Sequence, residues 1–380
     1  METEITIGNN FDEAIGLLMT YRCNINCNYC YIHHKQNKDM SLEMAQSILE
    51  PFLSKSKGLL TIAFMGGETL LAFNTIKHLT EWIKAKKLKR KYRLFGSTNG
   101  TLLNEDMKQW LKSNADIITL GLSYDGIPSA QKYNRTELYV DLDFFINTWP
   151  KQPIQMTINT DSVEHMAEGI VYLLRKGAIV HPNIAFEEKE WPEAKIKSYA
   201  SQLHKLIYFY NAYPEYPLIV QFIHDLNEYA ECLTHHKPPK KVCGAGNSFR
   251  VYDVDGIDYP CHILSPLVLD KKQLKTISNN PIGEDTGSHD KNCDGCPFIK
   301  SCPTCIGCNF IYRGDYSTRD KTHCKLMKIE VMAFIKKEII RLKEKKYLSP
   351  KDAAIIDSIE RLVPYLKAVS YTHLTLPTNR

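Results

Sequence analysis

The sequence predicts an α/β fold in which six β–α units form a partial (β/α)6 barrel of the TIM type, followed by a small cysteine-rich domain and a C-terminal helix. Two observations lead to this prediction. Short apolar runs alternate with amphipathic helical patterns from Ala14 to about Tyr210. Of the twelve cysteines, three lie at or before Cys30 and nine lie from Cys232 to Cys324. The cysteines are therefore concentrated in two regions, one near each end of the chain.

The expected elements follow one another in regular alternation. Strands are predicted at 14–21, 59–65, 92–97, 116–123, 153–159 and 178–186. Helices are predicted at 41–54, 73–87, 104–113, 137–148, 162–175 and 192–211. Ser41, Asn104 and Asp161 precede three of these helices as candidate N-caps. Because β–α–β connections are right-handed, the strand ends should share one rim, and functional groups should gather there.

Length and composition limit the function classes. A chain of 380 residues allows one large domain and a smaller one, and a net charge of +5 is too mild to indicate a nucleic-acid partner. The most basic run, residues 84–93, reads as the solvated end of a helix. The sequence shows no secretory signal and no apolar run long enough to cross a membrane. We therefore expect a cytoplasmic protein whose cysteines bind metal rather than form disulfides.

The segment after the first predicted strand carries Cys23, Cys27 and Cys30 in the spacing C-x3-C-x2-C. Three thiols on one loop can face a single centre. Iron–sulfur cubanes normally take four thiolates, so this loop would leave one iron with an open position. An open position is typical of a catalytic metal site rather than a structural one.

This spacing, with Tyr29 just before the last cysteine, resembles the signature of the radical S-adenosylmethionine (SAM) enzymes. The resemblance implies a [4Fe–4S] cluster on the three cysteines, and SAM bound at its open iron. It also implies a Gly-Gly-Glu motif for the SAM amino group, although this chain has Thr69 where proline is usual. A family histidine is replaced by Gln131. The SAM-binding residues implied in this way are Gly66, Gly67, Glu68, Asn99, Ser123, Arg135 and Asn159.

The late cysteines form the pattern C-x12-G-x4-C, then C-x2-C-x5-C-x2-C-x2-C, then a final Cys324. The segment between Cys243 and Cys261 reads as a β-hairpin that turns at Asp255-Gly256. The pattern resembles the SPASM extension of radical SAM peptide-modifying enzymes, which carries two auxiliary [4Fe–4S] clusters. By this resemblance one cluster takes Cys293, Cys296, Cys302 and Cys324. The other takes Cys243, Cys261 and either Cys305 or Cys308, with Cys232 as a candidate fourth ligand.

The family implies reductive cleavage of SAM to a 5′-deoxyadenosyl radical, which abstracts hydrogen from a peptide side chain or backbone and leads to a crosslink or an oxidation. The implied partners are a peptide or protein substrate, such as a ribosomally made precursor, and a reductant such as flavodoxin or ferredoxin. His262 directly follows a cluster cysteine and is a candidate catalytic base, with a surface histidine as the alternative.

Three other interpretations remain. An anaerobic sulfatase-type maturase is the first, although that family has an acidic residue where His262 stands. In the second, the pairs 293/296 and 302/305 form a zinc ribbon in a protein without SAM chemistry. In the third, the late cysteines build a nucleic-acid-binding module.

The expected domains are a barrel at 1–190, a helical bridge at 191–242, an auxiliary-cluster domain at 243–328 and C-terminal helices at 329–368. Residues 369–380 read as translated sequencing-adapter DNA, and we exclude them from the fold.

Overall fold

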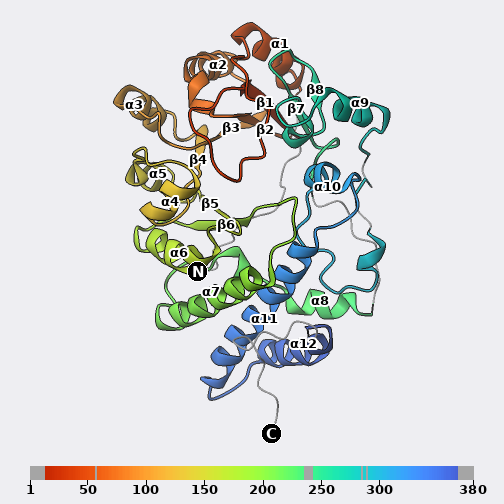
Figure 1. Ribbon diagram of the computed structural model, residues 1–380. Coiled ribbons are helices and arrows are strands. Elements are labelled where there is room, and N and C mark those ends of the chain that lie inside the picture. Colours follow the sequence, from red (N-terminus) through yellow and green to blue (C-terminus); the bar gives the residue numbers. More distant parts are fainter. Residues whose placement is uncertain (1–12, 56–57, 235–242, 284–285, 288–289, 367–380) are drawn as a thin grey trace. The chain divides into compact units, whose positions relative to one another are not determined.

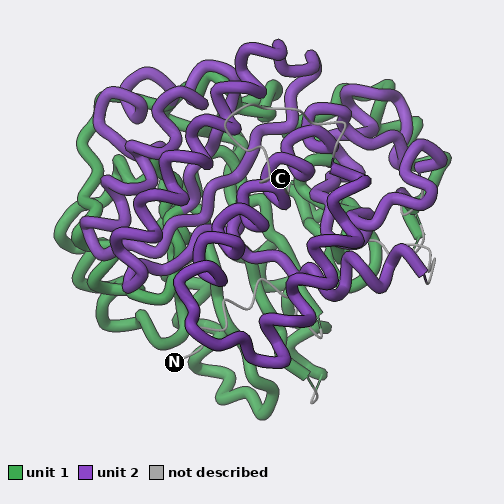
Figure 2. The backbone as a smooth tube through the Cα atoms, turned by 90° about the horizontal axis from the view of Figure 1, so that it is seen from below, with its two compact units in different colours: residues 1–124, 135–154, 243–286 green, residues 125–134, 155–242, 287–380 purple. Residues whose placement is uncertain are grey.

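The computed structural model describes residues 13–55, 58–234, 243–283, 286–287 and 290–366. The expected adapter-derived tail, 369–380, lies outside these described residues. The chain divides by packing into two compact units, each assembled from three stretches of sequence (Figure 2). The first unit contains residues 1–124, 135–154 and 243–286, and the second contains residues 125–134, 155–242 and 287–380. The domain limits expected from the sequence fall at other points and remain a prediction.

The first unit is built on a sheet with the strand order β4-β3-β2-β1-β7-β8 (Figure 1). These strands are β1 (Glu13–Thr20), β2 (Leu59–Gly66), β3 (Lys91–Thr98), β4 (Ile118–Leu122), β7 (Phe249–Tyr252) and β8 (Asp258–Tyr259). β1 to β4 and β7 pair in parallel, and β8 pairs antiparallel to β7. Leu17, Leu18 and Met19 in β1 are fully buried, as expected for a central parallel strand covered on both faces.

Helices follow the strands of the first unit, and α1, α2 and α3 lie outside them (Figure 1). The helices are α1 (Leu42–Leu53), η1 (Thr69–Ala72), α2 (Phe73–Ala85), α3 (Glu105–Ser113), α5 (Leu142–Thr148), η4 (His262–Leu264) and α9 (Lys271–Asn279). The side chains of Ser41 and Asn104 accept hydrogen bonds from the N–H groups of Met44 and Met107. Two of the expected N-caps are therefore confirmed.

The second unit is mainly helical, with the strand pair β5 (Ile154–Ile158) and β6 (Val180–Ile184). Its helices are α4 (Pro128–Asn134), η2 (Val163–His165), α6 (Met166–Arg175), α7 (Glu193–Ala212), η3 (Val220–Phe222), α8 (Leu226–Cys232), η5 (Lys291–Cys293), α10 (Ile306–Arg313), α11 (Lys321–Lys343) and α12 (Pro350–Leu366). α7 packs on α11, and the Tyr199 hydroxyl donates a 2.5 Å hydrogen bond to Glu330 in their buried interface. None of the described helices is both long and apolar enough to cross a bilayer.

The α/β class, with its mainly parallel sheet and six early strands at the expected positions, is confirmed. The helix expected at 137–148 is wrong in its first half. α5 begins only at Leu142, because the Asp141 side chain caps it by accepting from the N–H of Phe144. The helix α4 was not predicted from the sequence, and the side chain of Asp161 does not cap the helix that follows it.

The predicted hairpin at 249–259 is confirmed, with Gly256 in the left-handed conformation (φ 81°) at its turn. Its position was not foreseen. β7 adds to the free edge of β1 and pairs Gly16 with Val251. A Cβ atom on Gly16 would lie 2.8 Å from a methyl carbon of Val251, so glycine is what allows the two strands to approach. Residues 243–286 therefore belong to the same unit as the early strands.

Candidate active site

The loop with Cys23, Cys27 and Cys30 begins at the carboxyl end of β1. An ion pair joins the residue before Cys23 to Asp39, which follows the loop. The guanidinium of Arg22 binds both carboxylate oxygens of Asp39, at 2.9 and 2.5 Å. The three thiols are half-buried, and burial raises the pKa of the Cys23 thiol. All three thiols lie on this one loop, and their convergence on a single centre stays a prediction.

The glycines of the Gly-Gly-Glu motif bind the cysteine loop itself. The N–H of Gly67 donates to the Thr20 carbonyl oxygen at 3.1 Å. The N–H of Glu68 donates to the Arg22 carbonyl oxygen at 2.9 Å. A Cβ on Gly66 would lie 2.2 Å from the Thr20 oxygen, and one on Gly67 would lie 2.2 Å from the Arg22 oxygen. The family resemblance implied that these glycines contact SAM. The structure shows that backbone already fills the space, so their first role is to dock the cysteine loop on β2.

Glu68 is 1% exposed, and its carboxylate joins the ends of β2 and β3. Oε1 accepts from the Leu70 N–H at 3.0 Å and from the Thr98 hydroxyl at 2.6 Å, while Oε2 accepts from the Asn99 N–H at 2.8 Å. Burial raises the pKa of this carboxyl, and the three donors oppose that shift. The carboxylate is thus held rigidly in place beside the cysteine loop.

Asn99 also contacts the cysteine loop, through its side chain. Its Nδ2 donates to Oδ1 of Asn24 at 3.0 Å, and Asn24 in turn donates to the Thr101 hydroxyl at 2.8 Å. Asn24 lies between the first two cysteines and was not singled out from the sequence. A polar residue inside the C-x3-C spacing was the available signal, but nothing local shows that it meets the end of β3.

Arg135 brings a positive charge to this site. Its Nη1 lies 3.9 Å from Sγ of Cys27, and its guanidinium carbon lies 5.2 Å from the centre of the Tyr29 ring. This distance is within the range of a cation–π contact. Its charge also acts on the Glu68 carboxyl. Arg135, a predicted SAM-binding residue, therefore lies beside the cysteine loop although more than 100 residues separate it from Cys27 in the sequence.

The two remaining predicted SAM contacts differ in position. Ser123 directly follows β4, and its N–H donates to the Thr98 carbonyl oxygen at 2.9 Å, so it joins the same rim. Asn159 belongs to the second unit, where its Oδ1 accepts from the N–H groups of Asp161 and Ser162. Those bonds shape the turn after β5, which is a structural role for this side chain.

His262 lies against the loop of the first three cysteines. The centre of its ring is 5.7 Å from that of Tyr31, which follows Cys30 directly. Its Nδ1 is buried and has no hydrogen-bond partner among the described residues. Burial lowers the pKa of His262 to about 4, so the imidazole is neutral at pH 7. The contact between these two rings therefore joins the segment of Cys30 to the segment of Cys261, which lies far along the sequence.

Four of the late cysteines form one group in the second unit, which we call the four-thiol group: Cys293, Cys296, Cys302 and Cys324. Burial raises the pKa of Cys293 to about 11 and that of Cys302 to about 12, and it also raises that of Cys296. The charge of Cys324 adds to the shift in all three, so the sulfurs lie within electrostatic reach of one another. These are the four cysteines that the family pattern assigned to one auxiliary cluster.

The described side chains do not form a site for a single metal ion. In the described part of the chain, no three His, Cys, Asp or Glu side chains converge closely enough to hold a single metal ion. No disulfide joins the cysteines, all twelve of which are described.

Cys305 and Cys308 lie at the start of α10. The Cys305 side chain accepts from the Cys308 N–H at 3.5 Å and acts as the N-cap. The hydrogen bond from Cys308 lowers the pKa of Cys305 to about 7. A sulfur that accepts N–H donors at a helix start is already prepared to carry negative charge.

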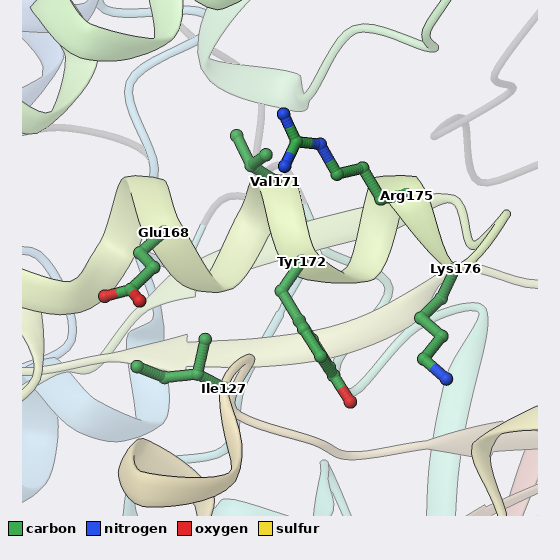
Figure 3. Close-up of a pocket in the computed structure, with 6 residues that line it drawn as sticks. All are labelled: Ile127, Glu168, Val171, Tyr172, Arg175 and Lys176. Atoms are coloured by element: carbon green, nitrogen blue, oxygen red, sulfur yellow. The ribbon is translucent and has the colours of Figure 1, made fainter.

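The second unit also has a surface pocket of about 410 Å³ on α6 (Figure 3). Its lining residues are Ile127, Glu168, Val171, Tyr172, Arg175 and Lys176. It contains none of the predicted site residues, and we assign it no role.

Residues 17–178 match the family model described as the Radical SAM superfamily. The chain carries a radical SAM domain. This domain spans the three-cysteine loop, Glu68 and Arg135, and it ends well before the late cysteines.

The proteins that this chain is similar to include maturases. A cysteine-type anaerobic sulfatase-maturating enzyme of Clostridium novyi is 22% identical over 84% of this chain and 93% of its own length. The structure of anSMEcpe with bound AdoMet superposes with a TM-score of 0.63 at 20% identity, covering 91% of this chain and 98% of that one. SuiB of Streptococcus suis bound to precursor peptide SuiA superposes with a TM-score of 0.53 at 16% identity, covering 82% and 76%. The chain covers 38%, 29% and 33% of the first three curated relatives that it matches.

Proposed function

We propose that this protein is a radical SAM enzyme that modifies a peptide or protein substrate. The observation that carries the proposal is the docking of the three-cysteine loop on the Gly-Gly-Glu segment, with Glu68 and Arg135 fixed beside it. Three thiols, one buried carboxylate and one guanidinium at the end of a parallel sheet fit a three-thiolate cluster and the charged amino-acid end of SAM.

Cys23, Cys27 and Cys30 would hold the [4Fe–4S] cluster, and Glu68 would bind the SAM amino group. A buried carboxylate whose pKa is raised gains from a nearby cation, and an ammonium group is such a cation. Arg135 and Ser123 would contact the carboxylate or ribose of SAM. When bound, the cluster and SAM supply a carbon radical that abstracts hydrogen from the substrate.

Gly66, Gly67 and Asn99 would position the site. Each holds the cysteine loop against the sheet, through backbone contact or through the hydrogen bond between Asn99 and Asn24. Asn159 stays a candidate SAM contact, with the structural role described above as its alternative. His262 would face the substrate as a neutral base.

The late cysteines would hold two auxiliary clusters. The four-thiol group would bind one of them. Cys243 and Cys261 would bind the other, together with Cys305 or Cys308, and Cys232 would be the fourth ligand. The thiols of the four-thiol group lie close enough to affect one another's pKa, and this supports the first assignment. A flavodoxin or ferredoxin would supply electrons to the clusters.

The substrate class follows from the relatives. SuiB binds a precursor peptide, and the Clostridium novyi enzyme matures sulfatases. Both observations support a peptide substrate with a modified side chain or backbone. The whole-length match to the sulfatase-maturating enzyme favours that activity as the second candidate.

The test begins with anaerobic reconstitution of the full chain, followed by an assay for 5′-deoxyadenosine with SAM and dithionite. We expect SAM-dependent product from the wild type and none from the Cys23→Ala/Cys27→Ala/Cys30→Ala variant. A wild type that is fully loaded with iron and forms no 5′-deoxyadenosine would refute the proposal. Incubation with a sulfatase-derived cysteine peptide and with precursor peptides, followed by mass spectrometry, distinguishes the two candidate substrates.

A further inference from the structure

Arg319 is a buried cation in the second unit. It is 7% exposed, and its backbone is fixed because the N–H donates to a carboxylate oxygen of Asp290 at 2.8 Å. The side chain turns toward the cysteines, where Nη1 donates to the Cys302 carbonyl oxygen at 3.2 Å. Its Nε is buried and has no hydrogen-bond partner among the described residues.

Among the described residues, the Asp290 carboxylate accepts a hydrogen bond from the backbone N–H of Arg319 and not from its guanidinium. Within the described residues Arg319 forms no ion pair, whereas its neighbour Arg313 pairs with Asp320. A buried guanidinium without an anion is strongly unfavourable, because it has lost its hydration and gained no opposite charge. None of the described side chains forms an ion pair with this guanidinium, so an anion bound beside it would be stabilised.

The groups around Arg319 identify that anion. Its positive charge acts on Cys293, Cys296 and Cys302, three of the cysteines in the four-thiol group. When these thiols bind iron they are deprotonated, and a cubane with four thiolates carries net negative charge. Arg319 is then the counter-charge of the bound cluster, and the cluster satisfies the guanidinium.

We propose that Arg319 sets the reduction potential of the cluster held by Cys293, Cys296, Cys302 and Cys324. This inference rests on the auxiliary cluster of the proposed function. Reduction adds one electron to the cluster and leaves the guanidinium unchanged, so the cluster becomes more negative by one charge. A fixed positive charge beside it stabilises the reduced form more than the oxidised form. Burial keeps the interaction from being screened by water and salt.

The experiment uses the full chain with Cys23, Cys27 and Cys30 replaced by alanine, so that only auxiliary clusters report. Into this background we place Arg319→Gln, which removes the charge, and Arg319→Lys, which keeps it. Arg313→Gln is the matched control, because it removes a guanidinium from the same segment that already has a carboxylate partner. Cys296→Ala identifies which spectroscopic signal belongs to the four-thiol group.

The readouts are iron and sulfide per chain, and the midpoint potential from a dithionite titration followed by electron paramagnetic resonance. We expect Arg319→Gln to lower the reduced-to-oxidised ratio at fixed potential at least about tenfold, equivalent to ~59 mV for one electron. Arg319→Lys and Arg313→Gln should stay close to the background. A selective loss of iron in Arg319→Gln that lysine prevents would also support a role for the charge.

Two results would overturn the inference while leaving the auxiliary cluster in place: an unchanged potential in Arg319→Gln with full iron, or an equal loss of iron in the Gln and Lys variants. The second result would show that only the shape of the side chain matters. A background protein that binds no iron would instead refute the auxiliary clusters of the proposed function.

Discussion

Glu68 offers the sharpest test of the proposed site, because it has a structural role and a proposed binding role that different measurements separate. Its carboxylate accepts three hydrogen bonds in a buried setting, from Leu70, Thr98 and Asn99. Glu68→Ala leaves three buried donors without their acceptor. At about 1 kcal/mol or more for each unsatisfied donor, and with partial relief by water, we expect a loss of about 2–4 kcal/mol in the free energy of unfolding.

Glu68→Gln should cost less. The amide oxygen can replace Oε1 and keep the bonds from Leu70 and Thr98, but the amide nitrogen then faces the N–H of Asn99. One bond is lost and two donors meet, so we expect a loss of about 1–2 kcal/mol. Urea unfolding of the metal-free protein measures both values, and the exposed Glu215→Gln is the control.

Binding is measured on the same variants by calorimetry with SAM after anaerobic reconstitution. If Glu68 holds the SAM amino group, Glu68→Gln should weaken SAM binding at least about tenfold while the protein remains folded. Equal unfolding free energies for the Gln, Ala and wild-type proteins would refute the structural reasoning. Unchanged SAM affinity in the Gln variant would refute the binding role.

Three further predictions follow from the geometry. Gly67→Ala should destabilise the metal-free protein by roughly 3 kcal/mol or more, since its Cβ would lie 2.2 Å from a backbone oxygen, whereas Gly177→Ala meets no atom within 4 Å and should cost less in urea unfolding. Burial raises the pKa of Glu330 from 4.5 to about 7, so the folded state binds more protons in this range. Stability should then fall by about 3 kcal/mol as pH rises from 4.5 through 7, and Glu330→Gln should remove this slope. If Cys305 is the cluster ligand, Cys305→Ser should lower bound iron by about four atoms per chain, and Cys308→Ser should retain it.

Each of these predictions has a contradicting outcome. Equal stability of the Gly67→Ala and wild-type proteins would show that the cysteine loop does not dock as described. A Glu330→Gln protein with the wild-type pH slope would assign the slope to another group. Full iron in Cys305→Ser together with reduced iron in Cys308→Ser would identify Cys308 as the ligand.

Strands such as β1 and β2 were predictable because a buried parallel strand is a largely continuous apolar run, and this signal is local. The N-caps at Ser41 and Asn104 were predictable for the same reason, since the cap and its partner are three residues apart. The helix at 137–148 was extended too far, because Asp141 can be read as a helix residue until its bond to the Phe144 N–H is seen.

Local spacing was also enough to find the three-cysteine loop, the Gly-Gly-Glu motif and the four-thiol group as candidate sites. A metal ligand must be a particular residue type at a particular offset, and the sequence records both. The partners of these residues are not recorded in this way. Glu68 accepts a hydrogen bond from the N–H of Asn99, and the guanidinium of Arg135 contacts the sulfur of Cys27. The rings of His262 and Tyr31 lie against each other. Each of these contacts depends on how strands and loops distant in sequence pack.

The same limit explains Gly67 and Arg319. Nothing in the sequence shows that the glycine faces a carbonyl oxygen of the cysteine loop, or that the arginine is buried close to Cys302. Residue type and spacing specify which groups can carry the chemistry. Long-range packing sets their charge environment and their burial, because both depend on neighbours that the chain brings together only when it folds.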